Sequence, residues 1–199
     1  MSSDRVPFVA LTGGLGAGKS TALDALERLG AVVLSTDKVV HELYRSPEVR
    51  DAVVARFGAE VAPEGAVDRR VLAERMFASE SDRDWVEGVL WPRVGERMVA
   101  WRAEVEGAEP RPPAAVVEVP LLFESGMEGA FDATIAVVAG EAVRGERARG
   151  RGHAAVAERT ARQLTQEEKA ARAQYVVVND GTPAELESAL SAVLDMLRQ

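Results

Sequence analysis

A glycine-rich run that ends in lysine and serine is the segment with the clearest chemical potential. Residues 13–20 read Gly-Gly-Leu-Gly-Ala-Gly-Lys-Ser, which satisfies the pattern G-x-x-x-x-G-K-[ST]. Glycine permits positive φ angles and lets backbone N–H groups approach phosphate oxygens without a Cβ clash. The run therefore predicts a loop that binds the phosphates of a nucleotide. The residues that we assign to nucleotide binding here are Gly14, Gly16, Ala17, Gly18, Lys19, Ser20 and Thr21.

Three side chains of this loop have separate expected roles. Lys19 can neutralise the β- and γ-oxygens of ATP, which makes it a catalytic candidate. Ser20 can offer its hydroxyl to Mg²⁺, and Thr21 can help to hold the α-phosphate. We therefore expect ATP and Mg²⁺ as ligands, with Ser20 as the metal-binding side chain.

Asp37 is a second catalytic candidate, because it follows the apolar run 31–34 after only Ser35 and Thr36. The carboxyl ends of parallel strands form the ligand crevice of an open α/β sheet. A carboxylate there could take the proton from an acceptor hydroxyl or orient that hydroxyl for attack on the γ-phosphorus. The alternative is structural: Ser35, Thr36 or Asp37 could be the N-cap of a helix. The position at a strand end favours the catalytic role.

The elements that must position these residues follow from the hydrophobic pattern. Five short apolar runs predict buried strands at residues 7–12, 31–34, 114–119, 133–138 and 175–178. Helical spacing in 19–29, between the first two runs, predicts a βαβ unit and hence a parallel sheet. We expect an α/β fold of the P-loop NTPase type: a three-layer α/β/α sandwich with a five-stranded parallel sheet, a helical acceptor-binding insertion and a helical lid.

The segments outside the sheet read as helical. Between residues 36 and 107 no strand is predicted, and Pro92 should break or kink the helix predicted over 82–106. Residues 141–172 are predicted to be helical and are rich in arginine, and Thr182-Pro183-Ala184-Glu185 is a capping box that begins the last helix. We therefore expect a nucleotide-binding core formed by 1–38, 107–142 and 172–199, a helical acceptor domain over 39–106, and a lid over 143–171.

Composition limits the classes of function. The 199 residues include no cysteine and carry a formal net charge of −8, which argues against nonspecific nucleic-acid binding. No apolar run approaches the length of a membrane span, and the first residues lack the layout of a secretory signal. We expect a cytoplasmic protein, a monomer or weak oligomer, that binds neither membrane nor nucleic acid.

Several nucleotide-binding classes share the phosphate loop. The sequence has no Asn-Lys-x-Asp, which a switch GTPase needs to recognise guanine. A motor or transporter ATPase would carry a strand of four apolar residues that ends in aspartate, whereas 114–117 leads to Glu118. A small-molecule or nucleoside monophosphate kinase and a module that binds ATP without transferring phosphate both stay open.

The sequence resembles the dephospho-CoA kinase family over nearly the whole chain. The resemblance begins with Ala10-Leu11-Thr12 and the phosphate loop, and continues with Thr36-Asp37-Lys38-Val39-Val40-His41-Glu42-Leu43. The most discriminating block is Glu118-Val119-Pro120-Leu121-Leu122-Phe123-Glu124, which shikimate, gluconate and adenylate kinases do not share. The other similar segments are Asp68-Arg69-Arg70-Val71-Leu72, Met76-Phe77, Arg149-Gly150, Gln163, Glu168-Lys169 and Val177-Val178-Asn179-Asp180-Gly181.

The resemblance implies a reaction and further site residues. The reaction is transfer of a phosphoryl group from ATP, with Mg²⁺, to the ribose 3′-hydroxyl of dephospho-CoA, which gives CoA and ADP in the last step of CoA biosynthesis. It implies Asp37 as the base for that hydroxyl, Arg149 as a catalytic and ATP-binding lid residue, and Asn179 as an ATP-binding residue. It also implies that dephospho-CoA is contacted by Asp37, Arg69, Pro120, Leu121, Leu122 and Glu124.

Two positions depart from the family pattern. Trp91-Pro92 stands where the family usually has His-Pro. Gly145 stands where the family tends to carry an arginine one helical turn before Arg149, with Arg144 and Arg147 nearby. The sequence leaves open which arginine of this cluster reaches ATP.

Overall fold

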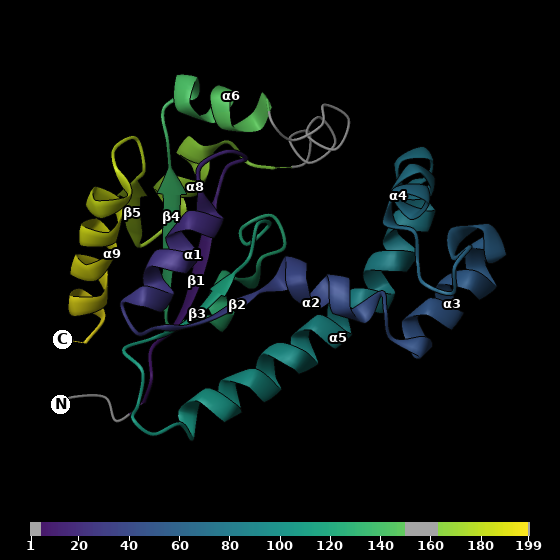
Figure 1. Cartoon of the computed structure of the whole chain (residues 1–199), viewed down its shortest axis with the longest axis horizontal. Helices are drawn as coiled ribbons and strands as arrows, with labels where there is room; N and C mark the ends of the chain where they lie inside the picture. Colours follow the sequence, from purple (N-terminus) through teal and green to yellow (C-terminus); the bar gives the residue numbers. More distant parts are fainter. Residues whose placement is uncertain (1–4, 150–162, 199) are drawn as a thin grey trace. The chain divides into compact units, whose positions relative to one another are not determined.

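A computed structural model describes residues 5–149 and 163–198, with only the backbone of Ala148 and Arg149. Within these residues, five parallel strands form one sheet in the order β2-β3-β1-β4-β5 (Figure 1). The strands are β1 (Phe8–Gly13), β2 (Val32–Ser35), β3 (Ala115–Glu118), β4 (Ala133–Val138) and β5 (Tyr175–Val178). The predicted five-stranded parallel sheet is thus confirmed.

One face of the sheet is covered by α1 (Lys19–Arg28) and α9 (Pro183–Leu197). Every residue of β1 is buried, as expected for a central parallel strand that is covered on both faces. Alternate residues of the strands point to this face because the side-chain period of a strand is two. Their core contains Val9, Leu11, Val116, Ile135 and Val137 with Leu23, Leu26, Leu186, Leu190 and Leu194.

The other face is covered in part by α8 (Gln166–Arg172), which contacts β1 and β4, and by the last turn of α5 (Glu80–Glu106). The guanidinium of Arg102 lies 4.4 Å from the centre of the Phe8 ring, and Phe8 stacks on Phe131. Helices on both faces make the three-layer sandwich that the sequence predicts. Because the strands are parallel, the carboxyl ends of β1, β3 and β4 lie at the same end of the sheet, where parallel sheets bind ligands.

The break that Pro92 could cause does not occur, and one predicted helix is interrupted. Pro92 lies inside α5, which continues from Glu80 to Glu106 without a break. Proline removes one backbone donor, the one that would bond the Gly88 carbonyl, and the helix continues on both sides of it. The helix predicted over 141–172 is also interrupted. α6 covers Glu141–Arg149, and residues 163–165 are extended because Thr165 is the N-cap of α8.

The chain divides into two compact units, Met1–Ser35 with Arg102–Gln199, and Thr36–Trp101. The second unit contains α2 (Thr36–Leu43), α3 (Pro47–Phe57), the 3₁₀ helix η1 (Ala59–Val61), α4 (Arg69–Ala78) and most of α5. No strand lies in its residues, all of which the structure describes. It has a core of its own, formed by Tyr44, Val49, Val53, Val61, Leu72, Val86 and Leu90. In the parts of the chain that the structure describes, no helix is long and apolar enough to span a membrane.

Candidate nucleotide-binding site

The glycine-rich loop joins β1 to α1 and has the backbone conformation that glycine allows. Gly16 has a φ of 76° and Gly18 a φ of 92°, both in the left-handed region. A Cβ on Gly18 would lie 2.1 Å from Nδ2 of Asn179, and one on Gly16 would lie 2.8 Å from the carbonyl oxygen of Arg144. Glycine is therefore required here both by the φ angles and by the close approach of neighbouring segments.

The polar side chains of the loop lie at the start of α1, whose N-terminus carries partial positive charge. The ammonium of Lys19 donates to the carbonyl oxygens of Gly13 at 2.9 Å and Gly14 at 3.2 Å. These contacts hold the charge of Lys19 against the loop. Ser20 and Thr21, the next two residues of the helix, are exposed. The loop thus presents a cation, two hydroxyls and a helix N-terminus together, which is the chemistry that binds phosphates.

Asn179 follows β5 and ties its end to the loop. Its side chain is buried, and Nδ2 donates to the carbonyl oxygen of Ala17 at 2.9 Å. Its own carbonyl oxygen accepts a hydrogen bond from Nη1 of Arg147 at 3.3 Å. Asn179 therefore supports the loop from the β5 side and also joins it to α6.

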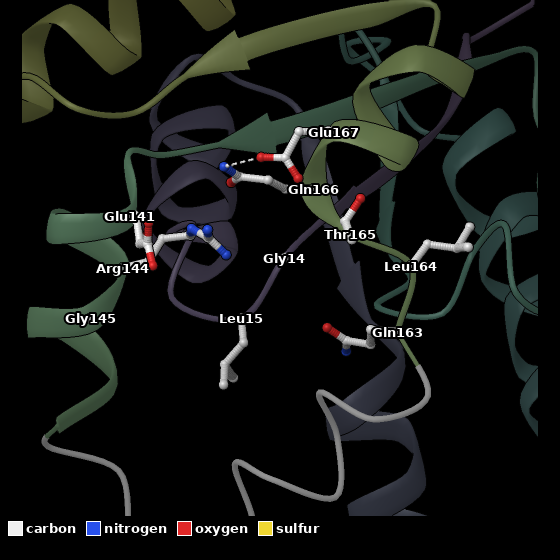
Figure 2. A pocket seen from close by; sticks show the side chains of 10 residues that line it. All are labelled: Gly14, Leu15, Glu141, Arg144, Gly145, Gln163, Leu164, Thr165, Gln166 and Glu167. Carbon is white, nitrogen blue, oxygen red and sulfur yellow. Dashed lines mark hydrogen bonds between the residues drawn. The ribbon is translucent and has the colours of Figure 1, made fainter.

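A pocket of about 390 Å³ lies beside the loop (Figure 2). Arg144 points into it from α6, towards Gly14 and Gln166. The Nε of Arg144 is buried and has no hydrogen-bond partner among the described residues. The pocket is lined by Gly14, Leu15, Glu141, Arg144, Gly145, Gln163, Leu164, Thr165, Gln166 and Glu167.

Sequence reasoning did not decide which arginine of α6 lies beside the phosphate loop. The side chain of Arg149, the predicted catalytic arginine, lies outside the described residues. Arg144 is the arginine that lines the pocket, and Arg147 is the one that contacts Asn179. Helical spacing puts Arg144 and Arg147 about one turn apart, but the sequence alone could not tell which of them faces the loop.

Opposite α6, the pocket wall consists of residues 163–167 at the start of α8. Hydrogen bonds at this helix N-terminus affect the charge of the wall. The hydroxyl of Thr165 accepts from the backbone N–H of Glu168 at 3.2 Å, and the Glu168 carboxylate accepts from the N–H of Thr165 at 2.8 Å. The backbone N–H of Glu167 and the side-chain amide of Gln166 hold the pKa of Glu167 below its usual value, with a smaller contribution from Arg144. The exposed wall therefore carries a negative charge across the pocket from Arg144.

At the carboxyl end of β3, Glu118 pairs in register with Leu11 of β1. The carboxylate of Glu118 is buried and accepts a hydrogen bond from the Ser35 hydroxyl at 2.9 Å. Sequence reasoning used Glu118 to argue against motor ATPases and as the first residue of the family block 118–124, but did not name it among the site residues. The signal that could have indicated a role at the nucleotide site was the place of Glu118 at the end of an apolar run, in the strand next to the one that precedes the glycine-rich loop.

The turn after β3 carries four of the predicted acceptor-contacting residues. Leu122 has no exposed surface, whereas Leu121 is half-buried. Glu124 is paired within the protein: its Oε1 lies 2.9 Å from Nζ of Lys169 and accepts from the N–H of Leu164 at 2.8 Å. The carbonyl oxygen of Pro120 accepts a further hydrogen bond from Lys169.

Asp37 and Arg69 belong to the helical unit, Thr36–Trp101. Helix α2 begins at Thr36, so Asp37 lies in its first turn and is exposed rather than serving as its N-cap. Arg69 begins α4, and its Nη1 lies 3.1 Å from Nδ1 of His41. Burial raises the pKa of the nearby Tyr44 to about 12.

The fold and the loop define a class of protein: a P-loop NTPase fold, in which a parallel sheet holds a glycine-rich loop with lysine and serine at the start of α1. The fold of a dephospho-CoA kinase from Campylobacter jejuni matches at a TM-score of 0.65 with 20% identity, covering 96% of this chain and 97% of that one. A gluconokinase from Sinorhizobium meliloti matches at 0.51 with 17% identity, covering 98% and 95%.

Sequence comparison then gives the particular family. The family model for dephospho-CoA kinase matches residues 7–185. A dephospho-CoA kinase from Protochlamydia amoebophila is 36% identical over 194 residues, which cover 96% of each chain. One from Anaeromyxobacter dehalogenans is 38% identical, covering 96% of this chain and 92% of that one. A crystal structure of a Thermus thermophilus protein, 32% identical, matches at a TM-score of 0.79 and covers 98% of this chain and 100% of that one. This chain belongs to the dephospho-CoA kinase family.

Proposed function

We propose that this chain transfers the γ-phosphoryl group of ATP to the ribose 3′-hydroxyl of dephospho-CoA, which gives CoA and ADP in the last step of CoA biosynthesis. The observation that carries the proposal is the match to the family model over residues 7–185, together with an intact phosphate loop. The class of reaction needs little covalent chemistry from the protein, because phosphoryl transfer is catalysed mainly by positioning and by charge stabilisation.

The triphosphate binds along the glycine-rich loop in this proposal. The backbone of Gly14, Gly16, Ala17 and Gly18 supplies N–H groups, and Thr21 adds a hydroxyl at the α-phosphate. Lys19 exchanges its hydrogen bonds to the Gly13 and Gly14 carbonyls for phosphate oxygens. Asn179 holds the loop in its conformation through its hydrogen bond to the Ala17 carbonyl. In this proposal it is also one of the residues of the ATP site.

Magnesium is part of the proposal, with Ser20 as the protein ligand. The residues present fit such an ion: Ser20 offers an exposed hydroxyl, and Glu118 lies buried at the end of the adjacent β3. A set of one hydroxyl and one carboxylate suits Mg²⁺, which keeps several waters and takes its other ligands from phosphates. When bound, the ion neutralises charge on the β- and γ-oxygens. Glu118 can accept a hydrogen bond from a hydroxyl or water at this strand end, as it does now from the Ser35 hydroxyl.

Arginines of α6 complete the charge around the phosphates. We assign this part to Arg144, whose Nε is buried beside the loop without a partner among the described residues. Arg149 stays a second candidate on the same helix, on sequence grounds. A guanidinium aimed at the charge that develops on the transferring group stabilises the transition state more than the ground state.

Asp37 is the proposed general base, and its support comes from the chain order. The acceptor hydroxyl must lose its proton as it attacks the γ-phosphorus, and an exposed carboxylate two residues after β2 can accept it. Arg69, Pro120, Leu121, Leu122 and Glu124 form the remaining acceptor set in this proposal. Because Leu122 and Glu124 are largely buried, we expect them to act by shaping the turn around Leu121.

The test is a coupled ADP-release assay with ATP, Mg²⁺ and dephospho-CoA, run beside shikimate, gluconate and nucleoside monophosphates. We expect turnover with dephospho-CoA alone. Lys19→Ala and Asp37→Asn should each lower kcat by about 100-fold or more, since each removes one charge-stabilising or proton-accepting group. Asp24→Asn makes the same change as Asp37→Asn at an exposed position of α1 and should leave kcat unchanged.

The remaining outcomes separate the alternatives. Turnover with shikimate, gluconate or a nucleotide would keep the P-loop kinase class and overturn the proposed acceptor. ATP binding without turnover for any acceptor would favour a module that only binds ATP. In that case, Asp37→Asn should change nothing, and Trp91→His would be the first variant to examine for recovered turnover.

A further inference from the structure

The largest fully buried side chain in the described part of the protein is a lysine, Lys169 of α8. Its ammonium donates to the carbonyl oxygen of Pro120 at 2.5 Å and lies 2.9 Å from Oε1 of Glu124. The same oxygen of Glu124 accepts the backbone N–H of Leu164 at 2.8 Å. One buried ion pair thus joins three segments: α8, the turn after β3, and the residues before α8.

Two of these segments, the turn 120–124 and the start of α8, are held to different strands of the sheet. Residues 163–167 line the pocket beside Gly14, and the turn 120–124 follows the strand end next to β1. The turn is also held to β1, because Val119 donates its N–H to the Leu11 carbonyl at 2.9 Å. The start of α8 is held to β4 by a double hydrogen bond, in which the Gln166 amide pairs with the backbone N–H and carbonyl of Ala139 at 3.1 and 2.9 Å.

A buried ion pair is a weak source of stability. Removing two charges from water costs about as much as their attraction returns, and apolar residues of similar volume often stabilise a protein equally or better. The pair here is also incompletely satisfied, because Oε2 of Glu124 is buried without a hydrogen-bond partner among the described residues. A pair with this geometry is better explained by the directional hydrogen bonds that it makes, which hold two segments in one relative position.

We propose that Lys169 and Glu124 are positioning residues, which set the turn 120–124 and the pocket wall 163–167 in one fixed relation. The inference rests on the proposed function only for its kinetic consequence. Phosphoryl transfer needs donor and acceptor in line, and a displacement of about 1 Å can cost roughly 100-fold in rate. In this inference the pair acts through these segments, as already expected for Glu124, rather than by direct contact with the phosphates or the acceptor.

The central experiment replaces the pair by apolar residues in the double variant Lys169→Met/Glu124→Leu. We expect this variant to melt at or above the temperature of the wild type, because no charge is left buried alone. We also expect kcat/KM for dephospho-CoA to fall at least about 10-fold while the Kd of ATP changes less than about threefold, since Lys19 and the loop stay intact. Arg172→Met is the matched control: it removes a cation from an exposed position of α8 and should leave both values unchanged.

Hydrogen exchange provides a readout that does not depend on the reaction. In the double variant, the amides of 120–125 and 163–168 should exchange faster than in the wild type, including the N–H of Leu164 that now donates to Glu124. The amides of β1 and α9 should exchange at the rates of the wild type. This measurement decides the inference even if the wild type does not phosphorylate dephospho-CoA, an outcome that sinks the proposed function alone.

Two results would overturn the inference. If the double variant keeps the wild-type kcat/KM and the wild-type exchange of both segments, the pair positions nothing. If it melts below the wild type and exchanges faster throughout the sheet unit, the pair is a stability element. The single variant Lys169→Met should be less stable than the double variant, because it leaves the carboxylate of Glu124 buried without its cation.

Discussion

At the scale of single residues, the phosphate loop depends on glycine, because a Cβ atom would not fit at several of its positions. Gly18 combines a φ of 92° with the closest approach of a side chain anywhere among the loop glycines, that of the Asn179 amide. Asn179 in turn is bound to the Ala17 carbonyl. A methyl group at position 18 would therefore strain the backbone and displace the amide that holds the loop.

Gly18→Ala should weaken ATP binding at least about 10-fold, measured by titration calorimetry, because the loop can no longer close around the phosphates. The matched control is Gly95→Ala, at a helical position of α5 where a Cβ meets nothing within 4 Å. We expect the control to bind ATP normally and to gain about 0.5–1 kcal/mol of stability from the better helix former. Normal ATP binding by Gly18→Ala would show that Asn179 can move away without cost to the site.

At the scale of elements, the helices that frame the site are defined by their caps. Both α8 and α9 begin with a threonine N-cap and a glutamate three residues later, with both reciprocal hydrogen bonds formed. In α9, the backbone N–H and hydroxyl of Thr182 hold the pKa of Glu185 below its usual value. α9 packs on α1, the helix that follows the phosphate loop, so its first turn contributes to the layer that supports the loop.

Thr182→Ala should lower the free energy of unfolding by about 1 kcal/mol at neutral pH, measured by denaturant titration, because the Glu185 N–H loses its cap. The carboxylate contribution has a defined pH dependence. A folded-state pKa below the unfolded value stabilises the fold above the unfolded pKa, and this contribution disappears as the pH falls through the folded pKa. The difference between wild type and variant should therefore narrow in acid.

The control for this prediction lies on the same helix. Ser188→Ala also removes a hydroxyl from α9, at an exposed interior position, and should be neutral or slightly stabilising because alanine is the better helix former. A pH-independent difference between wild type and Thr182→Ala would mean that the hydrogen bond from the Thr182 hydroxyl to the Glu185 carboxylate contributes nothing.

At the scale of the whole molecule, stability is divided between two cores. The sheet unit packs α1 and α9 on the strands, and the helical unit Thr36–Trp101 buries Tyr44, Leu72 and their neighbours in a cluster of its own. The side chains of each core pack against residues of the same unit. We therefore expect a defect in one core to be felt first by the amides of that unit.

Leu72→Ala and Leu190→Ala form a matched pair that tests this division. Each removes the same side chain from a fully buried position, one in each core, at an expected cost of about 2–5 kcal/mol. By hydrogen exchange, Leu72→Ala should lose protection mainly within residues 36–101, and Leu190→Ala mainly in the sheet, α1 and α9. Equal loss of protection throughout the chain in both variants would show that the two units unfold as one.

Much of this organisation was predictable from local patterns. The five strands are short apolar runs, the loop is a motif of fixed spacing, and the caps of α9 are adjacent in sequence. The structure differs from the sequence-based expectation at two helices. Pro92 lies within α5, which continues through it, and the helix predicted over 141–172 is interrupted before α8, where Thr165 caps that helix.

The sequence by itself determined the phosphate loop, because the motif consists of residues adjacent in the chain, and it determined the family through similarity along nearly the whole chain. Only the tertiary structure decided that Arg144 lines the pocket, that Leu122 is buried, and that Lys169 pairs with Glu124. These facts join residues that are distant in the sequence. Each depends on which face of a helix or turn packs inward, and that choice is made by the packing of neighbouring elements rather than by local spacing.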